Sequence, residues 1–138
     1  MFLPVSFQGE APTPLAQPRA EAKGTGGEEL PPGQIRANAA RKAYEASALL
    51  FETGRADMEV AYIWSCRWLQ AEREISKTKA DEISAIEAHL VRMRKLHETV
   101  KTGLRAARMR QDHVWAVEYY IAEGEQWLLR EREEQEGR

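Results

Sequence analysis

The stretch FETGRADMEV, residues 51–60, interrupts a chain that otherwise favours helix over most of its length. Its Gly54 closes an apolar-periodic segment that ends at Phe51. Glycine just past a helix end is the commonest C-terminal cap, because it adopts the left-handed conformation at little cost. Asp57 then offers an N-terminal cap for the next helix. We therefore predict a helical hairpin here rather than one long rod.

A second stretch with a similar pattern follows further along the chain. VKTG, residues 100–103, also closes an apolar-periodic segment, and each glycine is followed by arginine within two residues and then by an aromatic-rich segment. This is a weak internal duplication of helical hairpins, with Gly103 as the second turn. The alternative is that Gly103 lies inside a continuous helix, because the apolar spacing from Val100 through Leu104 to Val114 does not slip.

The region after Pro32 contains no further proline and is dominated by good helix formers. Apolar spacing predicts four helices, at residues 34–53, 57–76, 79–102 and 105–136. Thr78 followed by Asp81 resembles a capping box at the start of the third, and Gly124 on the apolar stripe of the fourth predicts a close helix crossing. The second has two apolar stripes, which imply two neighbouring helices. The fold class is therefore all-α, either an antiparallel four-helix bundle or paired long helical hairpins, within a domain of residues 34–138. Since the first helix is alanine-rich, the bundle can complete its core by self-association.

Residues 1–33 have a different composition, because they contain all six prolines and five of the nine glycines. Such a segment cannot bury enough apolar surface to offset its chain entropy, so we predict a disordered N-terminal leader. Its MFLPVSF start lacks the basic residues of a signal peptide, although Arg19–Ala22 has the small-x-small spacing of a cleavage site. We expect a periplasmic or envelope location if a signal sequence was clipped, and a cytoplasmic one otherwise. No apolar stretch is long enough to span a membrane.

The duplicated hairpins, over residues 40–130, resemble the periplasmic coiled coils of TolC-type outer-membrane efflux proteins. The resemblance is carried by tips that read Y/F-x-x-G, matched here by Phe51 and Gly54 and then by Gly103. Val60 stands where the family usually has aspartate, the second tip carries extra residues in LRAARMRQD, and barrel strands are absent. In that family the tips bind the periplasmic adaptor. The resemblance therefore implies a stand-alone pair of hairpins associated with the envelope, without transport activity.

No motif for catalysis or cofactor binding emerges. The single cysteine, Cys66, excludes an intramolecular disulfide, and we expect a half-buried thiol. Met93 falls on the apolar stripe, and the spacing predicts that His89 and His97 flank it as boundary histidines rather than metal ligands. We predict no enzyme activity, no metal, no cofactor and no small-molecule substrate.

Charge is distributed unevenly along the chain. Residues 92–110 hold seven basic residues against one acid, whereas residues 112–136 hold eight acids against two arginines. These stretches can pair across a hairpin seam. Alternatively, the basic stretch binds an anionic partner through the three arginines that end it, Arg105, Arg108 and Arg110.

Two aromatic residues, Trp115 and Tyr119, follow this basic stretch. Packing in the core is the favoured interpretation, and an exposed anchor for a protein partner is the alternative. The leading functional hypothesis is a non-catalytic helical scaffold or protein-interaction module. The alternative is a cytosolic regulatory domain that binds nucleic acid through residues 92–110.

Overall fold

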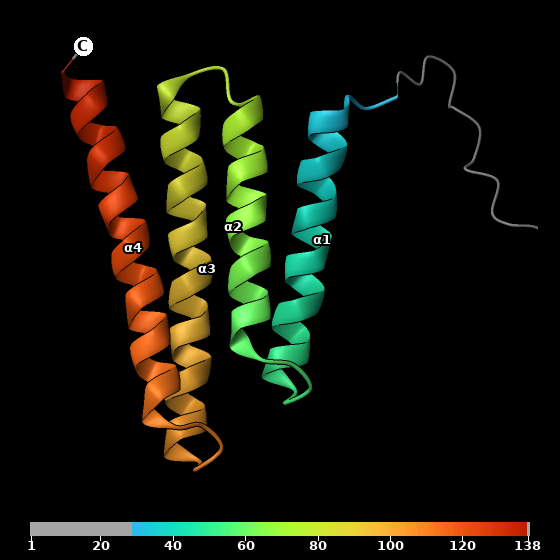
Figure 1. The fold of residues 1–138 in the computed structure, drawn as a ribbon, viewed down its shortest axis with the longest axis vertical. Helices are drawn as coiled ribbons and strands as arrows, with labels where there is room; N and C mark the ends of the chain where they lie inside the picture. The colour runs from blue at the N-terminus through green and yellow to red at the C-terminus, as the bar shows by residue number, and fades with distance from the viewer. Residues whose placement is uncertain (1–28, 138) are drawn as a thin grey trace, which may run out of the picture. The chain divides into compact units, whose positions relative to one another are not determined.

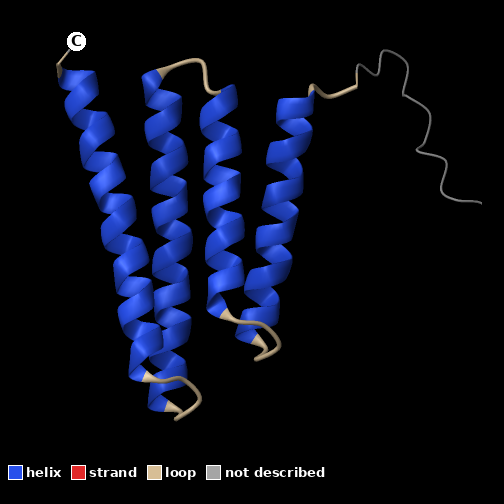
Figure 2. Cartoon of the chain, in the orientation of Figure 1, coloured by secondary structure: helices blue, strands red, loops and turns tan. Residues whose placement is uncertain are grey.

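The structure, a computed structural model, describes residues 29–137, so the predicted leader lies outside the described range apart from its last residues. The described chain contains four α-helices and no strand (Figure 2). They are α1 (Pro32–Glu52), α2 (Met58–Ile75), α3 (Lys79–Arg105) and α4 (Gln111–Glu136). The predicted all-α class is confirmed. Helix α1 begins two residues earlier than predicted because proline is well suited to the first position of a helix.

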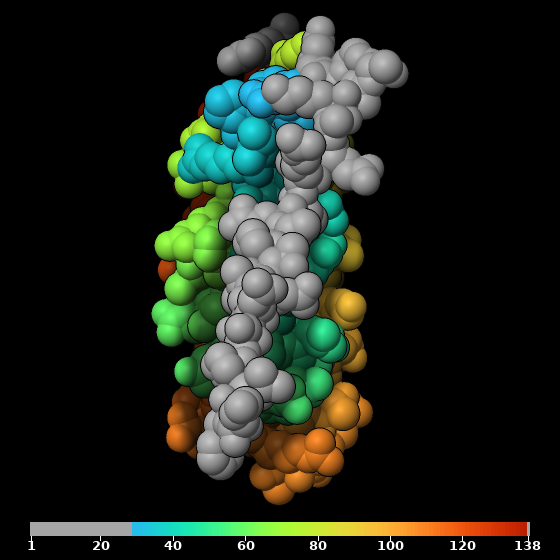
Figure 3. Space-filling model, turned by 90° about the vertical axis from the view of Figure 1, so that its right-hand side faces the viewer, coloured from blue at the N-terminus to red at the C-terminus, as the bar shows by residue number. Residues whose placement is uncertain are grey.

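The helices form two antiparallel hairpins, α1 with α2 and α3 with α4. The closest packing is within each hairpin, and α2 packs against α3 to join them. Figure 1 accordingly shows α2 and α3 between the outer helices α1 and α4. The second hairpin is longer, so the α3–α4 turn extends beyond the α1–α2 turn (Figure 3). The two tips therefore form a step at one end of the bundle.

The core is built from the predicted apolar stripes. Its main cluster includes Tyr44 and Phe51 from α1, Ala61 from α2, Met93 from α3 and Val117 from α4. Since all four helices contribute, the hairpins share one core rather than forming separate ones.

Two predicted local features of the helices are confirmed. A Cβ atom on Gly124 would lie 2.7 Å from Leu90 Cδ2, so this glycine marks a close crossing of α4 over α3. At the start of α3, the Thr78 hydroxyl oxygen accepts a hydrogen bond from the Asp81 N–H at 3.1 Å.

An ion-pair cluster joins three helices at the end opposite the tips. Glu131 of α4 is almost fully buried and accepts hydrogen bonds from Arg73 of α2, at 2.6 Å, and from Lys79 of α3. These contacts raise the pKa of the Lys79 ammonium. They hold the non-tip ends of α2, α3 and α4 together.

Within residues 29–137, no helix has both the length and the apolar character that crossing a bilayer requires.

Candidate interaction site at the hairpin tips

The first turn is built on Gly54, as predicted. Helix α1 ends at Glu52, and Gly54 takes a φ of +74°, with empty space where a Cβ would project. The Arg55 N–H closes the turn by donating to the Leu50 carbonyl at 2.7 Å. Glycine is needed here for its backbone conformation and not for space.

The left-handed residue of the second turn lies four residues beyond Gly103, so the assignment of Gly103 as a turn residue was wrong. Helix α3 continues through Gly103 to Arg105, and α4 begins only at Gln111. The left-handed residue is Ala107, with a φ of +58°. A Cβ on Gly103 would lie 2.4 Å from Met109 Cγ. This glycine therefore gives Met109 room to fold back against the helix.

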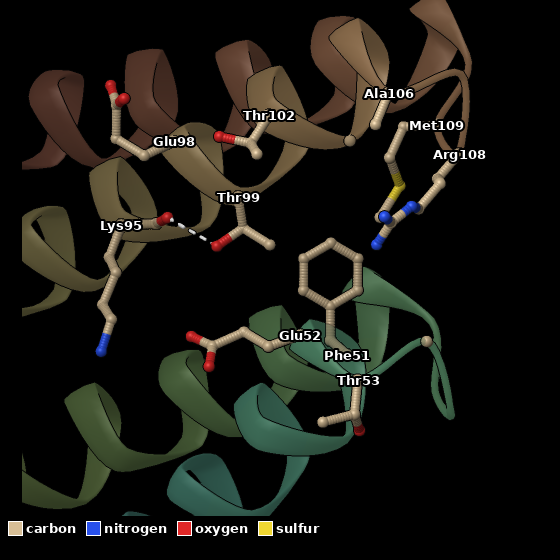
Figure 4. Close-up of a pocket in the computed structure, with 12 residues that line it drawn as sticks. Phe51, Glu52, Thr53, Lys95, Glu98, Thr99, Thr102, Ala106, Arg108 and Met109 are labelled. Atoms are coloured by element: carbon tan, nitrogen blue, oxygen red, sulfur yellow. Dashed lines mark hydrogen bonds between the residues drawn. The ribbon is translucent and has the colours of Figure 1, made fainter.

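The step between the two tips holds a groove of about 680 Å³. Figure 4 shows Phe51 rising from the end of α1, with Met109 and Arg108 coming toward it from the second turn. Phe51 is only 3% exposed, and Met109 packs against the same core cluster. Charged side chains, including Glu52 and Lys95, line the rest of the groove. An apolar floor with a charged rim suits a protein side chain better than a small polar substrate.

The arginines near the second tip differ in their partners. Arg110 donates to both carboxylate oxygens of Asp112, each at 3.0 Å. By contrast, the guanidinium groups of Arg105 and Arg108 form no hydrogen bond or ion pair with residues 29–137. Of the three arginines predicted to bind a partner, Arg105 and Arg108 are therefore available, and Arg110 is already paired with Asp112.

The rest of the basic stretch is largely neutralised. Arg94 pairs with Glu125 of α4 at 3.4 Å, which confirms the predicted pairing across the seam. Lys101 pairs with Glu98 at 2.8 Å and thereby lowers the pKa of that carboxyl group. Arg92 is buried. The segment therefore does not present a continuous positive surface.

Trp115 and Tyr119 lie on the outside of α4, so the favoured prediction that they are core residues was wrong. Each is 63% exposed. The neighbouring Tyr120 is the ring that faces inward, stacked on Tyr62 of α2 with centroids 3.7 Å apart. Helix α4 therefore separates its aromatic residues between an inner and an outer face.

A buried polar cluster between α2 and α3 was not predicted. His89 is fully buried rather than at the boundary, and its Nδ1 lies 2.8 Å from the Ser65 hydroxyl. That oxygen accepts a hydrogen bond from Arg92 Nε at 2.6 Å, so the hydroxyl proton is free to be donated to His89. Burial, and to a smaller extent the charge of Arg92, lowers the pKa of His89 to about 4. His89 is therefore neutral at physiological pH.

The cluster does not constitute an accessible catalytic pair. Ser65 and His89 have the contact of a nucleophile with its base, but neither is exposed to solvent. The guanidinium of Arg92 lies 3.9 Å from the centre of the Trp68 ring, a cation–π contact that helps to stabilise the buried charge. The sequence did carry a signal for the burial of His89, because this residue lies on the same helix face as Ile86 and Met93.

Cys66 is half-buried, as predicted, and burial raises the pKa of its thiol, which makes the thiolate scarce at neutral pH. Residues 29–137 contain no grouping of three or more histidine, cysteine or acidic side chains that could hold a metal ion.

The fold and the tip geometry define a small all-α protein made of two joined helical hairpins. Comparison of the chain with protein-family models, with curated proteins and with solved structures found no match. The resemblance to TolC-type coiled coils therefore stays a prediction.

Proposed function

We propose that this protein is a non-catalytic helical interaction module that binds a protein partner at its hairpin tips. The observation that supports this proposal is the groove floored by Phe51 and Met109 and lined by Arg108. The guanidinium groups of Arg108 and of the nearby Arg105, the last residue of α3, are unpaired within residues 29–137. An apolar side chain of the partner enters the groove. Carboxylates beside that side chain bind the two arginines, since guanidinium groups form strong bidentate contacts with carboxylates.

The cellular location belongs to the same proposal. In TolC-type proteins, which this chain resembles, the hairpin tips contact the periplasmic adaptor. A coiled-coil-like hairpin pair with tips of this chemistry is suited to the same kind of contact. We therefore place the partner among proteins of the cell envelope, with an acidic and apolar segment that reaches the tips.

Site-specific photocrosslinking in the host cell tests the proposal. A benzophenone amino acid at Ala106, in the groove, should form one discrete adduct, whereas the same probe at Gln70 of α2 should not. Reversing both arginine charges, Arg105→Glu with Arg108→Glu, should abolish the adduct. The matched control, Arg130→Glu on α4, should leave it intact. An adduct that survives the double reversal, or forms equally at Gln70, contradicts the proposal.

Binding to nucleic acid through residues 92–110 is the competing function. Fewer basic side chains are available to contact phosphates than the sequence suggested. Arg92 is buried, and three other basic residues are in ion pairs, namely Arg94, Lys101 and Arg110. Duplex DNA titrated at low and then rising salt separates the two functions. Affinity that falls steeply with salt favours nucleic acid, and an absence of binding at low salt removes it.

A further inference from the structure

Helix α4 carries a second apolar stripe that faces away from the bundle. Its large members are Trp115 and Tyr119, each 63% exposed, and Leu129, which is 59% exposed. Ala122 and Gln126, both exposed, lie between them. These five positions follow one another at spacings of four, three, four and three residues, so they line one side of the helix over about 21 Å.

This outer stripe, defined by the five residues Trp115 to Leu129, is distinct from the stripe that builds the core. The core stripe of α4 includes Val114, Val117 and Gly124, all buried. Because α4 is an outer helix of the bundle (Figure 1), no other helix of residues 29–137 covers its far side. Alternating spacings of three and four are those of a coiled-coil seam, and they favour another helix as the occupant of this face.

The charges beside the outer stripe indicate which helix that is. Glu118 and Arg132 lie on the same flank of α4, two full heptads apart, with Glu125 midway between them. Glu118 forms no ion pair with residues 29–137, and Arg132 is held only by an exposed contact with Glu87 at 2.8 Å. An acid near the start of a helix and a base near its end are complementary to the same helix running in the opposite direction.

We propose that the outer stripe of α4 pairs with the outer stripe of a second copy of this chain, antiparallel, about a two-fold axis near Glu125. Each Glu118 then faces Arg132 of the second copy. Tyr119 packs beside Leu129 of the second copy, and the small Ala122 beside Gln126. The two Glu125 side chains then meet at the axis, where each carboxylate is paired with Arg94 of its own chain at 3.4 Å. A parallel pair would instead bring Glu118, which has no such partner within residues 29–137, near Glu123 of the second copy, and two like charges there are unfavourable.

The contact is isologous, because each copy offers the same face, so it closes at the dimer and does not continue into a filament. It leaves the groove at the tips open on both copies. The inference is therefore independent of the partner proposed for the tips, and either can fail without the other.

Sedimentation velocity of the full chain over a wide concentration range is the first test. The wild type should convert from monomer to dimer as concentration rises. Trp115→Glu with Tyr119→Glu should weaken dimerisation by roughly a hundredfold, because exposed aromatic anchors dominate helical interfaces. Leu49→Glu is the matched control on α1, where Leu49 is 61% exposed, and it should leave dimerisation unchanged. A chain that stays monomeric, or a dimer insensitive to the α4 pair, overturns the proposal.

Charge exchange tests the direction of the pairing. Glu118→Arg alone and Arg132→Glu alone should each weaken the dimer several-fold, and the two together should restore it. Circular dichroism of each variant confirms that the fold is kept. If the double variant is no tighter than the single ones, the antiparallel register is wrong.

A distance measurement then checks the geometry directly. Spin labels at Gln111, in a Cys66→Ser background, should lie about 40 Å apart in the antiparallel dimer and only about 10 Å apart in a parallel one. The shorter distance overturns the proposal.

Discussion

The two hairpins reverse the chain by different means, although each has a Thr-Gly pair near the end of its first helix. In the first hairpin, Gly54 is the left-handed residue, with a φ of +74° and free space around it. In the second, Gly103 is helical and crowded by Met109, and Ala107 takes the left-handed conformation. A glycine near a helix end can thus serve the backbone in one place and the packing in another.

This difference affects how stability is distributed between the tips. A left-handed alanine costs about 1–2 kcal/mol relative to glycine in the same conformation. The second turn accepts that cost and leaves Arg105 and Arg108 exposed, with Arg108 lining the groove. The first turn is unstrained and lies next to Phe51, which is almost fully buried. The shorter hairpin therefore anchors the tip region, and the longer one presents the residues proposed to bind.

The largest effect on stability is expected from truncating the side chains that form the groove floor, Phe51 from the first hairpin and Met109 from the second. Phe51→Ala should reduce the free energy of unfolding by about 3–5 kcal/mol, because it removes a buried aromatic ring from the main cluster. Met109→Ala should cost only about 1 kcal/mol, since that side chain is partly exposed and its turn can adjust. Urea unfolding of both variants measures the difference. Equal losses would show that the two tips contribute alike.

The stability of the seam between the hairpins should respond to pH through His89. Native His89 resists protonation until about pH 4, whereas the unfolded chain takes up that proton near pH 6.5. The stability contributed by neutral His89 is therefore complete above pH 6.5 and falls as pH decreases toward 4. The loss should reach about 2 kcal/mol at pH 5. Urea midpoints between pH 7 and pH 5 measure it.

Two variants isolate the origin of that pH dependence. His89→Gln keeps a hydrogen-bonding side chain without a titratable ring, so its midpoint should vary much less over this range. His97→Gln should keep the wild-type dependence, because His97 is partly exposed and lies outside the buried cluster. If His97→Gln removes the dependence and His89→Gln does not, the buried cluster is not its source.

The sequence was sufficient for features that depend on local spacing. The turn at Gly54, the cap at Thr78 and the close crossing at Gly124 each follow from one residue type at one place in a helical pattern. The pairing of Arg94 with Glu125 required only that α3 and α4 lie side by side. Local chemistry and apolar period therefore account for the number of helices and their order.

Features that depend on tertiary contact were missed. The apolar spacing passes through Gly103 without a slip, so it could not show which residue near the end of α3 turns the chain. Helix α4 has two apolar stripes, and spacing alone cannot tell which one packs, hence the error at Trp115 and Tyr119. The burial of His89 depends on Ser65 of another helix, and that contact forms only when the hairpins meet.

The smallest expected effects come from exchanging the turn residues themselves. Gly54→Ala should destabilise the protein by about 1–2 kcal/mol, because alanine is strained at a positive φ even where space is free. Ala107→Gly should stabilise it by less than about 1 kcal/mol, since relief of strain is offset by the greater freedom of glycine in the unfolded chain.

Ala106→Gly is the matched control, because Ala106 has an ordinary φ of −87° and glycine there relieves no strain. It should lower stability slightly. Urea midpoints of the three variants rank them, and stabilisation by both glycine substitutions would mean that the second turn is strained beyond Ala107 alone.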